Sequence, residues 1–212
     1  MAETGARALG RPPDPDLQDR RRRELLLAAI DLFARKGFSS TEVQEIADAA
    51  GVAKGTVYRY FESKEALFLA AADLSMRELT EWIDRAVERC VEPVERLRTA
   101  ALTVAGYFER YPERIELLAQ ERAVFRGSIP PTHAVYREKR RPRFEATLRE
   151  AIESGKLRSV DVRALANALS YLLFGAILCG SVEHSPRTLK RLVRESIDVV
   201  LGLLKTGDDP HV

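Results

Sequence analysis

The side chains best suited to chemistry gather in one short segment, residues 53–61. Lys54 and Arg59 can donate hydrogen bonds to guanine O6 and N7, and Gly55 would let the backbone approach a base closely. Hydroxyl groups in the same segment can donate to phosphate oxygens, which fixes a protein on a duplex without reading its sequence. These hydroxyls belong to Thr56, Tyr58 and Tyr60. The segment therefore offers the chemistry of a nucleic-acid contact rather than that of a reaction.

A wider pattern around this segment can position it against DNA. In a window that opens at residue 43, the fifth, ninth and fifteenth places are Ala47, Gly51 and Val57. A helix-turn-helix needs a small residue where its helices cross, a turn residue that tolerates positive φ, and an apolar anchor on the second helix. Residues 43–62 are therefore predicted to form such a motif. Its second helix would cover 53–61, with Val57 and Phe61 buried.

The elements around the motif are predicted to be helices. The first has an apolar face at positions i, i+4 and i+7, formed by Leu26, Ile30 and Phe33. This helix should end at Gly37, because glycine readily caps a helix C-terminus. Thr41 and Gln44 have the spacing of a capping box for the next helix, and Ser63 is expected to cap a long helix over 64–90.

Helical periodicity continues to the end of the chain. Pro93 and Pro112 are expected to open two helices, and Pro142 to break or kink a third. The remaining expected helices cover 93–110, 112–126, 142–154, 160–182 and 186–204. No segment shows sustained strand alternation, so the chain is predicted to be all-α.

Composition bounds the class of protein without selecting a partner. The 212 residues include 34 basic and 32 acidic side chains, for a net charge of +2. Residues 20–64 carry nine Lys or Arg against six Asp or Glu, an excess of three that is compatible with nucleic acid. Cys90 and Cys179 lie far apart without metal-ligand spacing, which argues against a zinc site and a disulfide scaffold and fits a reducing cytosol. We expect neither a metal nor a cofactor.

Two segments bear on the location of the protein. The first 23 residues lack the apolar core of a signal peptide, so we expect a cytoplasmic protein with a flexible tail over residues 1–19. Residues 164–182 form a run of 19 without a charge, which is long enough to span a bilayer. The run contains Asn167 and Ser170 and lies between charged helices. A helix buried on most sides of a soluble domain is therefore preferred to a membrane span.

Residues from about 20 to 70 resemble the DNA-binding domain of the tetracycline-repressor (TetR) family of bacterial transcriptional regulators. The resemblance rests on three ordered blocks: AxxLFxxKGF from Ala29, IAxxAGV from Ile46, and KGTVYRYFxSKEAL from Lys54. It covers about a quarter of the chain, and the rest resembles the family only in helical layout. It implies an N-terminal three-helix helix-turn-helix domain over 20–66 and a C-terminal helical domain over 67–206 for effector binding and dimerisation.

The resemblance also implies which residues touch double-stranded operator DNA. These are Thr41, Lys54, Gly55, Thr56, Tyr58, Arg59, Tyr60 and Lys64. Lys64 and the adjacent amides suit a phosphate because a helix N-terminus carries partial positive charge. Position 53 departs from the family pattern, since it is Ala53 where related proteins often have serine, and one hydroxyl contact should be missing.

Arg20 to Arg23 form a second basic group just before the expected start of the first helix. Four cations at a helix N-terminus oppose the helix dipole, and contact with a polyanion would offset that cost. We therefore consider an arm that reaches phosphates or the minor groove, with a merely solvated arginine run as the alternative.

The C-terminal domain is expected to pair two protomers through its last two helices. One recognition helix covers a half-site, and a dimer places two of them about 34–36 Å apart. Two helices from each protomer would form a four-helix bundle, with Ala176 and Gly180 as a small-xxx-small pair. The expected interface comprises Leu165, Leu169, Leu172, Ala176, Gly180, Leu189, Leu192, Val193, Ile197, Val200 and Leu204. The alternative is that these residues form the core of a single protomer.

By resemblance, an unidentified small-molecule effector would bind among the helices at 93–110, 112–126, 142–154 and 160–182. The candidate lining residues are Phe108, Glu121, Arg122, Phe125, Phe144, Asn167, Tyr171 and Phe174. Arg122 extends an apolar stripe, where a charge needs a partner or an anionic ligand. The alternatives are that the aromatic residues belong to the core and that Arg122 pairs with a neighbouring glutamate.

The preferred function is a ligand-responsive DNA-binding transcriptional regulator, most simply a repressor that binds a palindromic operator as a homodimer and is released by its effector. A DNA-binding structural protein without an effector is the alternative. An enzyme is disfavoured because the sequence shows no nucleophile elbow, phosphate loop or metal-ligand pattern.

Overall fold

The computed structural model describes residues 15–127, 129–183 and 188–206, and these residues are overwhelmingly helical. The helices in this part of the chain are α1 (Pro15–Lys36), α2 (Val43–Ala49), α3 (Lys54–Tyr60), α4 (Lys64–Val87), α5 (Pro93–Arg110), α6 (Glu113–Phe125), α7 (Thr132–Glu153), α8 (Val162–Glu183) and α9 (Leu189–Leu204). The β pairing in the same residues is one isolated bridge between Leu157 and Lys205. The predicted all-α class is confirmed.

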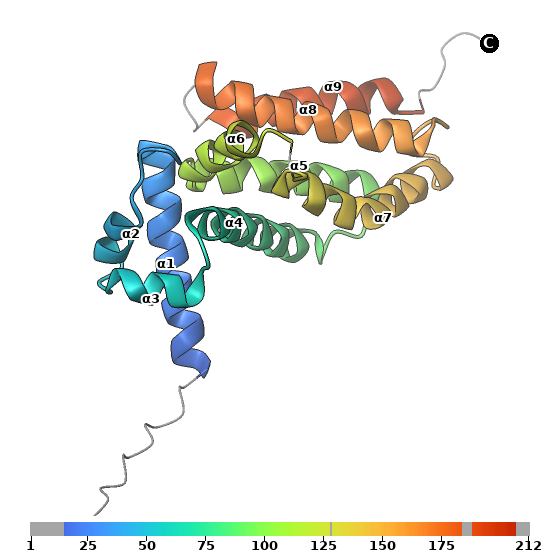
Figure 1. Cartoon of the computed structure of the whole chain (residues 1–212). Coiled ribbons are helices and arrows are strands. Elements are labelled where there is room, and N and C mark those ends of the chain that lie inside the picture. The colour runs from blue at the N-terminus through green and yellow to red at the C-terminus, as the bar shows by residue number, and fades with distance from the viewer. Residues whose placement is uncertain (1–14, 128, 184–187, 207–212) are drawn as a thin grey trace, which may run out of the picture.

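Helices α1 to α3 form a small N-terminal unit against the start of α4 (Figure 1). Its core, called the N-terminal core below, comprises Leu25, Leu26, Ala29, Ile30, Leu32, Phe33, Val43, Ile46, Ala47, Val57, Phe61, Leu67, Phe68, Ala71, Ala72, Leu74 and Leu117. The predicted apolar face of α1 lies within it. Gly37 and Gly51 both have positive φ, 81° and 65°, and their backbone closes the turns after α1 and α2.

Helix α1 begins earlier than the sequence suggested. It starts at Pro15, so residues 15–19, which we expected in the tail, belong to the helix. Proline suits the first turn of a helix because its missing N–H has no partner there, and Asp16 in that turn complements the dipole. The expected tail over residues 1–14 lies outside the described residues.

The capping box of α2 is shifted by one residue, so the predicted Thr41–Gln44 box is wrong. Glu42 is the N-cap, and its side chain and that of Glu45 exchange hydrogen bonds with each other's backbone N–H groups. Thr41 is fully buried, and its hydroxyl donates to the Leu32 and Gly37 carbonyl oxygens at 3.2 and 2.8 Å. The hydroxyl therefore closes the C-terminus of α1 instead of the N-terminus of α2.

The C-terminal unit packs α4 to α9 around α5, which contacts α4, α7 and α9 (Figure 1). Tyr107 on α5 is fully buried, and its ring packs edge-on against Trp82 and Tyr111 with centroids 5.4 and 5.2 Å away. The predicted break at Pro142 does not occur, because α7 runs from Thr132 to Glu153 with Pro142 inside it. Pro142 is exposed, on the side of α7 turned toward solvent.

Helix α8 is less enclosed than its composition suggested. It is long and apolar enough to cross a membrane by length and composition, a test that core helices of soluble proteins also pass. We expected it to be buried on most sides, but only 17% of its apolar window is buried within the protomer. Its buried positions lie on one stripe: Ala166, Leu169, Ile177 and Gly180. The opposite side of α8 is left open.

About half of the expected dimer-interface residues lie inside the protomer instead. Leu169, Gly180, Leu189, Val193 and Ile197 are buried in the chain's own C-terminal core. A Cβ at Gly180 would lie 2.9 Å from Leu189 Cδ2 and 3.1 Å from Leu192 Cδ1, so the small residue serves the contact between α8 and α9 of one chain. Of the other expected residues, Leu165, Ala176, Val200 and Leu204 pack partly against the same core.

Candidate nucleic-acid interface and effector cavity

Helix α3 presents its polar side chains to solvent because its apolar residues anchor it on the other side. Val57 is 1% exposed and Phe61, which follows the helix, is 5% exposed. Lys54, Gly55 and Arg59 are exposed, and Tyr58 keeps 46% of its surface. The predicted burial of Val57 and Phe61 is confirmed. Ala53 is the N-cap and supplies no side-chain hydrogen bond, as its missing hydroxyl implies.

The other candidates on this unit are less free than expected. Thr56 and Tyr60 are half-buried, and Tyr60 packs against the N-terminal core. Lys64 Nζ donates to the Ser39 carbonyl oxygen at 3.2 Å and lies 4.7 Å from the Phe38 ring centroid. An ammonium group has three donors, so Lys64 retains capacity for a phosphate in a position that the loop fixes. Thr41 is buried and its hydroxyl is used within the protein, which removes that side chain from the candidates.

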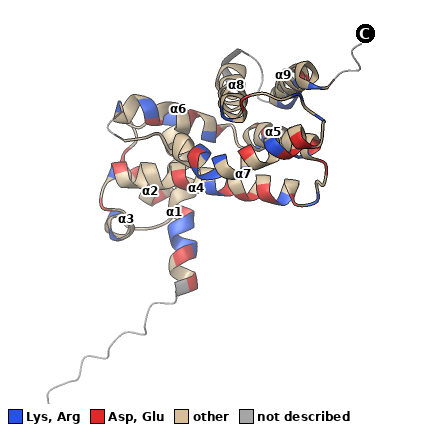
Figure 2. Cartoon of the chain, turned by 90° about the vertical axis from the view of Figure 1, so that its right-hand side faces the viewer, with Lys and Arg blue, Asp and Glu red and all other residues tan. Residues whose placement is uncertain are grey.

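Arg20 to Arg23 lie within α1 rather than before it, and each has a distinct environment. Arg21 pairs with Glu24 at 2.8 Å, and Arg23 pairs with Glu78 of α4 at 2.5 Å. Arg20 Nε donates to the Asp16 carbonyl oxygen, and the Arg22 guanidinium lies 5.3 Å from the Phe61 ring centroid, at the end of α3. Figure 2 shows this basic stretch of α1 near α3. Arg20 and Arg22 are therefore the better placed to add to the surface of α3.

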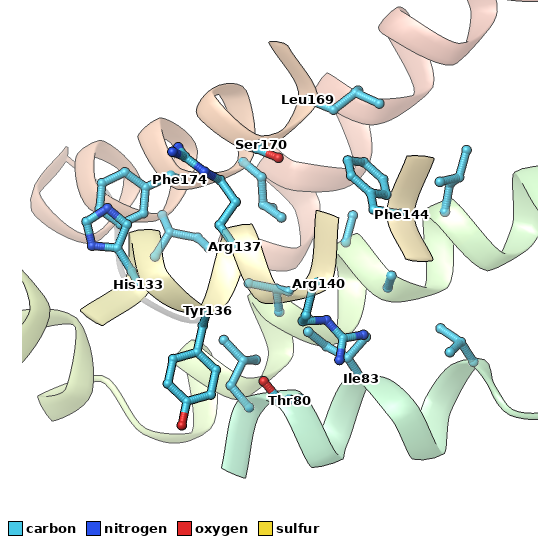
Figure 3. A pocket seen from close by; sticks show the side chains of 18 of the residues that line it. Thr80, Ile83, His133, Tyr136, Arg137, Arg140, Phe144, Leu169, Ser170 and Phe174 are labelled. Atoms are coloured by element: carbon cyan, nitrogen blue, oxygen red, sulfur yellow. The ribbon is translucent and has the colours of Figure 1, made fainter. Parts of the chain in front are cut away.

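A cavity of about 250 Å³ runs through the C-terminal unit between α4, α5, α7 and α8 (Figure 3). Its walls are mostly aliphatic and aromatic, from residues such as Leu79, Ile83, Val104, Leu118 and Leu173. The length of the cavity follows from α4, which lines it from Met76 to Val87. Eleven residues of helix rise about 16 Å, and a volume of about 250 Å³ spread over that length makes the cavity long relative to its width.

Three of the eight predicted effector residues line this cavity. They are Phe108, Phe144 and Phe174. Glu121, Arg122 and Phe125 lie instead around a separate hollow where α6 ends. Glu121 is buried because its carboxylate accepts hydrogen bonds from Thr132 N and Oγ1 and so caps α7, whereas Arg122 is exposed.

The last two candidates, Asn167 and Tyr171, do not line the cavity. Asn167 Oδ1 accepts a hydrogen bond from Arg141 at 2.9 Å, which ties α8 to α7. Tyr171 is 59% exposed, and the Arg137 guanidinium lies 5.0 Å from its ring centroid. Tyr171 directly follows Ser170, which lines the cavity, so a turn of one residue about the axis of α8 places its side chain outside.

The sequence reading missed the contributions of α4 and of the first half of α7. The residues from α7 that line the cavity are His133, Tyr136, Arg137, Arg140, Arg143, Phe144 and Thr147. They recur every three or four residues, which is the spacing of one helix face. Helical periodicity did not reveal this face, because arginines are normally expected on the solvent-exposed side of an amphipathic helix.

His133 lies at the α6 end of the cavity (Figure 3). Its ring stacks on Phe174 with centroids 4.1 Å apart and planes 13° from parallel. Burial, followed by the charges of Arg137 and Arg122, lowers the pKa of His133 from its usual value of 6.5. Its Nδ1 atom is buried without a hydrogen-bond partner in the described structure, and it is therefore a free polar contact for a bound molecule.

A buried ionic network joins the two units. Arg114 on α6 is 3% exposed and pairs with Glu78 on α4 and with the Tyr107 hydroxyl, which donates in turn to the Ser75 carbonyl oxygen at 2.7 Å. Glu78 also pairs with Arg23 on α1. Burial alone would raise the pKa of Glu78, but Arg114 and Arg23 lower it overall, so the carboxylate stays ionised.

Helix α6 also contacts both units directly. Leu117 is part of the N-terminal core, whereas its neighbour Leu118 lines the cavity. Gln120 accepts a hydrogen bond from Phe38 N at 3.1 Å and donates one to the Phe33 carbonyl oxygen at 3.0 Å. A shift of α6 caused from the cavity would therefore reach the end of α1.

These features define a helical protein in which a helix-turn-helix unit is joined to a second unit with an apolar cavity. The same residues carry a family match, because residues 25–71 fit the family described as bacterial regulatory proteins, tetR family. The N-terminal unit of the chain is therefore similar to the DNA-binding domain of the TetR family. Among the described residues, no group of three or more His, Cys, Asp or Glu side chains is placed to hold a metal ion.

Comparisons with individual proteins agree with this assignment. The chain is 32% identical over 101 residues to the transcriptional activator FasR of Mycolicibacterium smegmatis, a stretch that covers 48% of this chain and 46% of FasR. The chain thus spans less than half the length of this curated relative. Among solved structures, it is similar to PfmR of Thermus thermophilus, a TetR-family regulator, with 27% identity, a TM-score of 0.68, and coverage of 84% of this chain and 97% of PfmR.

A third comparison shows the fold alone. The regulator FadR of Bacillus subtilis, solved in complex with stearoyl-CoA, is 21% identical, with a TM-score of 0.69 and coverage of 82% of this chain and 96% of FadR.

Proposed function

We propose that this protein is a transcriptional repressor that binds a palindromic operator as a homodimer and is released by a small-molecule effector. The observation that carries the proposal is the pairing of an exposed recognition helix, α3, with an apolar cavity in a unit that shares α6 with the N-terminal core. A structural DNA-binding protein has no need of the cavity.

On DNA, α3 would enter the major groove. Arg59 and Lys54 would read base edges and Gly55 would allow close approach, while Tyr58, Thr56, Tyr60 and Lys64 would hold phosphates. Arg20 and Arg22 on α1 would extend the basic surface, since Arg20 contacts a backbone carbonyl and Arg22 an aromatic ring, whereas Arg21 and Arg23 form ion pairs with glutamates.

The effector would act through α6, since this helix touches both the cavity and the end of α1. A molecule in the cavity that fits one position of α6 better than another would shift the spacing of the two recognition helices and lower operator affinity. The direction of regulation is part of the proposal, because FasR is an activator whereas we propose a repressor here.

A binding assay and a reporter together test the proposal. Fluorescence anisotropy with labelled DNA from upstream of the protein's own gene should give saturable binding that competitor DNA does not remove. The affinity should fall with added salt in proportion to the few phosphates neutralised, at about 0.9 in log–log slope for each. Deletion of the gene should raise transcription from the bound promoter. Absence of specific binding at low salt would refute DNA binding, and lowered transcription would identify an activator.

A further inference from the structure

The charged side chains that line the cavity are all of one sign. Arg96, Arg137, Arg140 and Arg143 line it together with His133, and no aspartate or glutamate among the described residues does. Most of the remaining wall is apolar, and its other polar residues carry uncharged hydroxyls: Thr80, Tyr136, Thr147 and Ser170. A cation would be repelled here, and a wholly apolar molecule would leave the guanidinium groups unused.

Two of these arginines are committed to the fold. Arg96 donates to the Cys90 and Val91 carbonyl oxygens at 3.1 and 3.0 Å and pairs with Glu150 at 2.7 Å, so it fastens the loop between α4 and α5. Arg137 points toward α8, where it stacks over Tyr171, and it contacts Glu138 at 3.3 Å (Figure 3). Neither guanidinium group is the best placed to bind an anionic ligand.

Arg140 and Arg143 are different because they share one carboxylate oxygen. Arg140 Nη1 lies 3.0 Å from Asp84 Oδ1, and Arg143 Nη1 lies 2.7 Å from the same atom. One carboxylate balances one guanidinium, so the group retains one positive charge. Arg143 is 60% exposed at the surface, whereas Arg140 is only 26% exposed and lies beside Ile83 and Thr80 on the α4 side of the cavity (Figure 3).

An anion in the cavity can therefore bind Arg140 while Asp84 keeps an ion-pair partner. Arg140 would turn to the ligand, and Asp84 would keep Arg143 as its partner. Asp84 is also 41% exposed, so solvent and Arg143 together can compensate its charge when Arg140 turns away.

The shape of the cavity limits the rest of the ligand. From Arg140 to His133 the wall follows seven residues of α7, a rise of about 10 Å, along a channel of modest volume. Phe108, Leu118 and Phe174 also line this cavity. A narrow apolar channel that leads away from a cation suits an extended hydrocarbon chain better than a fused ring system.

We propose that the effector is a medium-chain carboxylic acid, with its carboxylate at Arg140 and its chain directed toward His133 and Phe174. This inference rests on the proposed function, because it names the effector class of the proposed regulator. It does not depend on DNA binding for its test.

Calorimetric titration of the free protein with three ligands of equal chain length tests the charge. Decanoate should bind at least about tenfold more tightly than decanol, because a charge-assisted hydrogen bond is lost in the alcohol, and decylamine should bind more weakly still. Decanoyl-coenzyme A distinguishes the free acid from its thioester, which has no carboxylate for Arg140 and should bind more weakly than decanoate. Equal binding of decanol, preference for decylamine, or tighter binding of decanoyl-coenzyme A would overturn the proposal.

Two substitutions with opposite expected effects test whether Arg140 binds the carboxylate. Arg140→Met keeps an unbranched chain against Ile83 and should weaken decanoate about tenfold or more, while decanol is unaffected. Asp84→Asn releases Arg140 from its carboxylate and should tighten decanoate several-fold, which a loss of fold cannot mimic. Arg149→Met, on the exposed side of the same helix, is the matched control and should leave all affinities unchanged. Unaltered selectivity in both test variants would refute Arg140 as the seat.

Measurements of operator binding distinguish failure of the carboxylic acid hypothesis from failure of the proposed regulatory function. Decanoate binding by a protein that fails to bind DNA would refute the regulator and support the cavity assignment. DNA binding that decylamine releases and decanoate does not would refute the carboxylic acid and support the regulator.

Discussion

At the scale of single residues, the candidate DNA contacts depend on side chains that never touch DNA. Val57 and Phe61 hold α3 against the N-terminal core, and their burial determines that Tyr58 and Arg59 face outward. Arg59 is the exposed side chain of α3 with the geometry for a bidentate contact to guanine.

Arg59→Ala should therefore weaken operator binding by about 1–3 kcal/mol, roughly tenfold to a hundredfold, and relax the base preference at one position of each half-site. The measurement is anisotropy with a set of operators that differ at single base pairs. Arg149→Ala, an exposed arginine on α7, serves as the control for loss of one charge. A uniform loss on every operator would show that Arg59 holds a phosphate instead.

His133 should make stability depend on pH. Because burial lowers its folded-state pKa below the usual 6.5, the unfolded chain takes up the proton first as the pH falls. The stabilisation from neutral His133 is complete above about pH 6.5 and is lost below it. Urea unfolding between about pH 7 and about pH 5 should show a shallower decline for His133→Phe, which keeps an aromatic ring on Phe174. Parallel declines would contradict the assignment.

Local sequence was enough for some residues and not for others. Val57, Gly37 and Ser63 were predicted correctly, because each depends on its own turn or helix face. Thr41 was not, because two adjacent residues carry side-chain oxygens and only the packing against the end of α1 decides which one caps α2.

At the scale of elements, the Arg114 network is the firmest link between the two units. Arg114 and Glu78 have 4% and 15% exposed side chains, so loss of one leaves the other charged and little solvated. Arg114→Met should lower the free energy of unfolding by about 3 kcal/mol, at the lower end for a buried pair because Arg23 still contacts Glu78.

The double variant Glu78→Leu with Arg114→Met is the control for that prediction. It removes both charges and should recover most of the loss, since apolar replacements of a buried pair are often neutral. Chemical unfolding of the three proteins measures the effect. A double variant as unstable as Arg114→Met would show that packing by the arginine matters more than its charge.

Gln120 tests whether α6 carries the signal. Gln120→Met removes two hydrogen bonds to the end of α1 and keeps an unbranched side chain. Operator affinity of the free protein should change little. The coupling free energy between decanoate binding and operator binding should shrink by about 0.5–2 kcal/mol. The same decanoate factor in variant and parent would mean that coupling takes another route.

Helix positions followed from periodicity, but helix neighbours did not. The apolar stripes of α4 and α5 are legible in the sequence, since each recurs every three or four residues. Which stripe faces a cavity, a neighbouring helix or a second protomer depends on packing across the whole unit. The α8 and α9 residues show this, because the expected interface proved to be half core.

At the scale of the whole molecule, α8 and α9 lie side by side at one edge (Figure 2). Their outer face is largely apolar. Its exposed or half-buried members lie every three or four residues on each helix: Ala168, Leu172, Gly175 and Cys179 on α8, and Leu192, Ser196, Val199 and Leu203 on α9. Val199 and Leu203 are 63% and 66% exposed, although both are large and apolar. Such a face is costly in a monomer, and exposed apolar faces of this size are typical of protein interfaces.

Val199→Glu should therefore dissociate the proposed homodimer while leaving each protomer folded. In a two-fold interface the change occurs twice, and a carboxylate enclosed among Leu203, Leu192 and their counterparts would lack a partner. Sedimentation should show at least about a hundredfold rise in the dimer dissociation constant. Operator affinity should fall with it, because one protomer covers only a half-site. Val91→Glu is the matched control, since Val91 is 85% exposed in the loop between α4 and α5. If the two variants remained equally dimeric, the interface would lie elsewhere, and the spacing of the recognition helices would have to come from another surface.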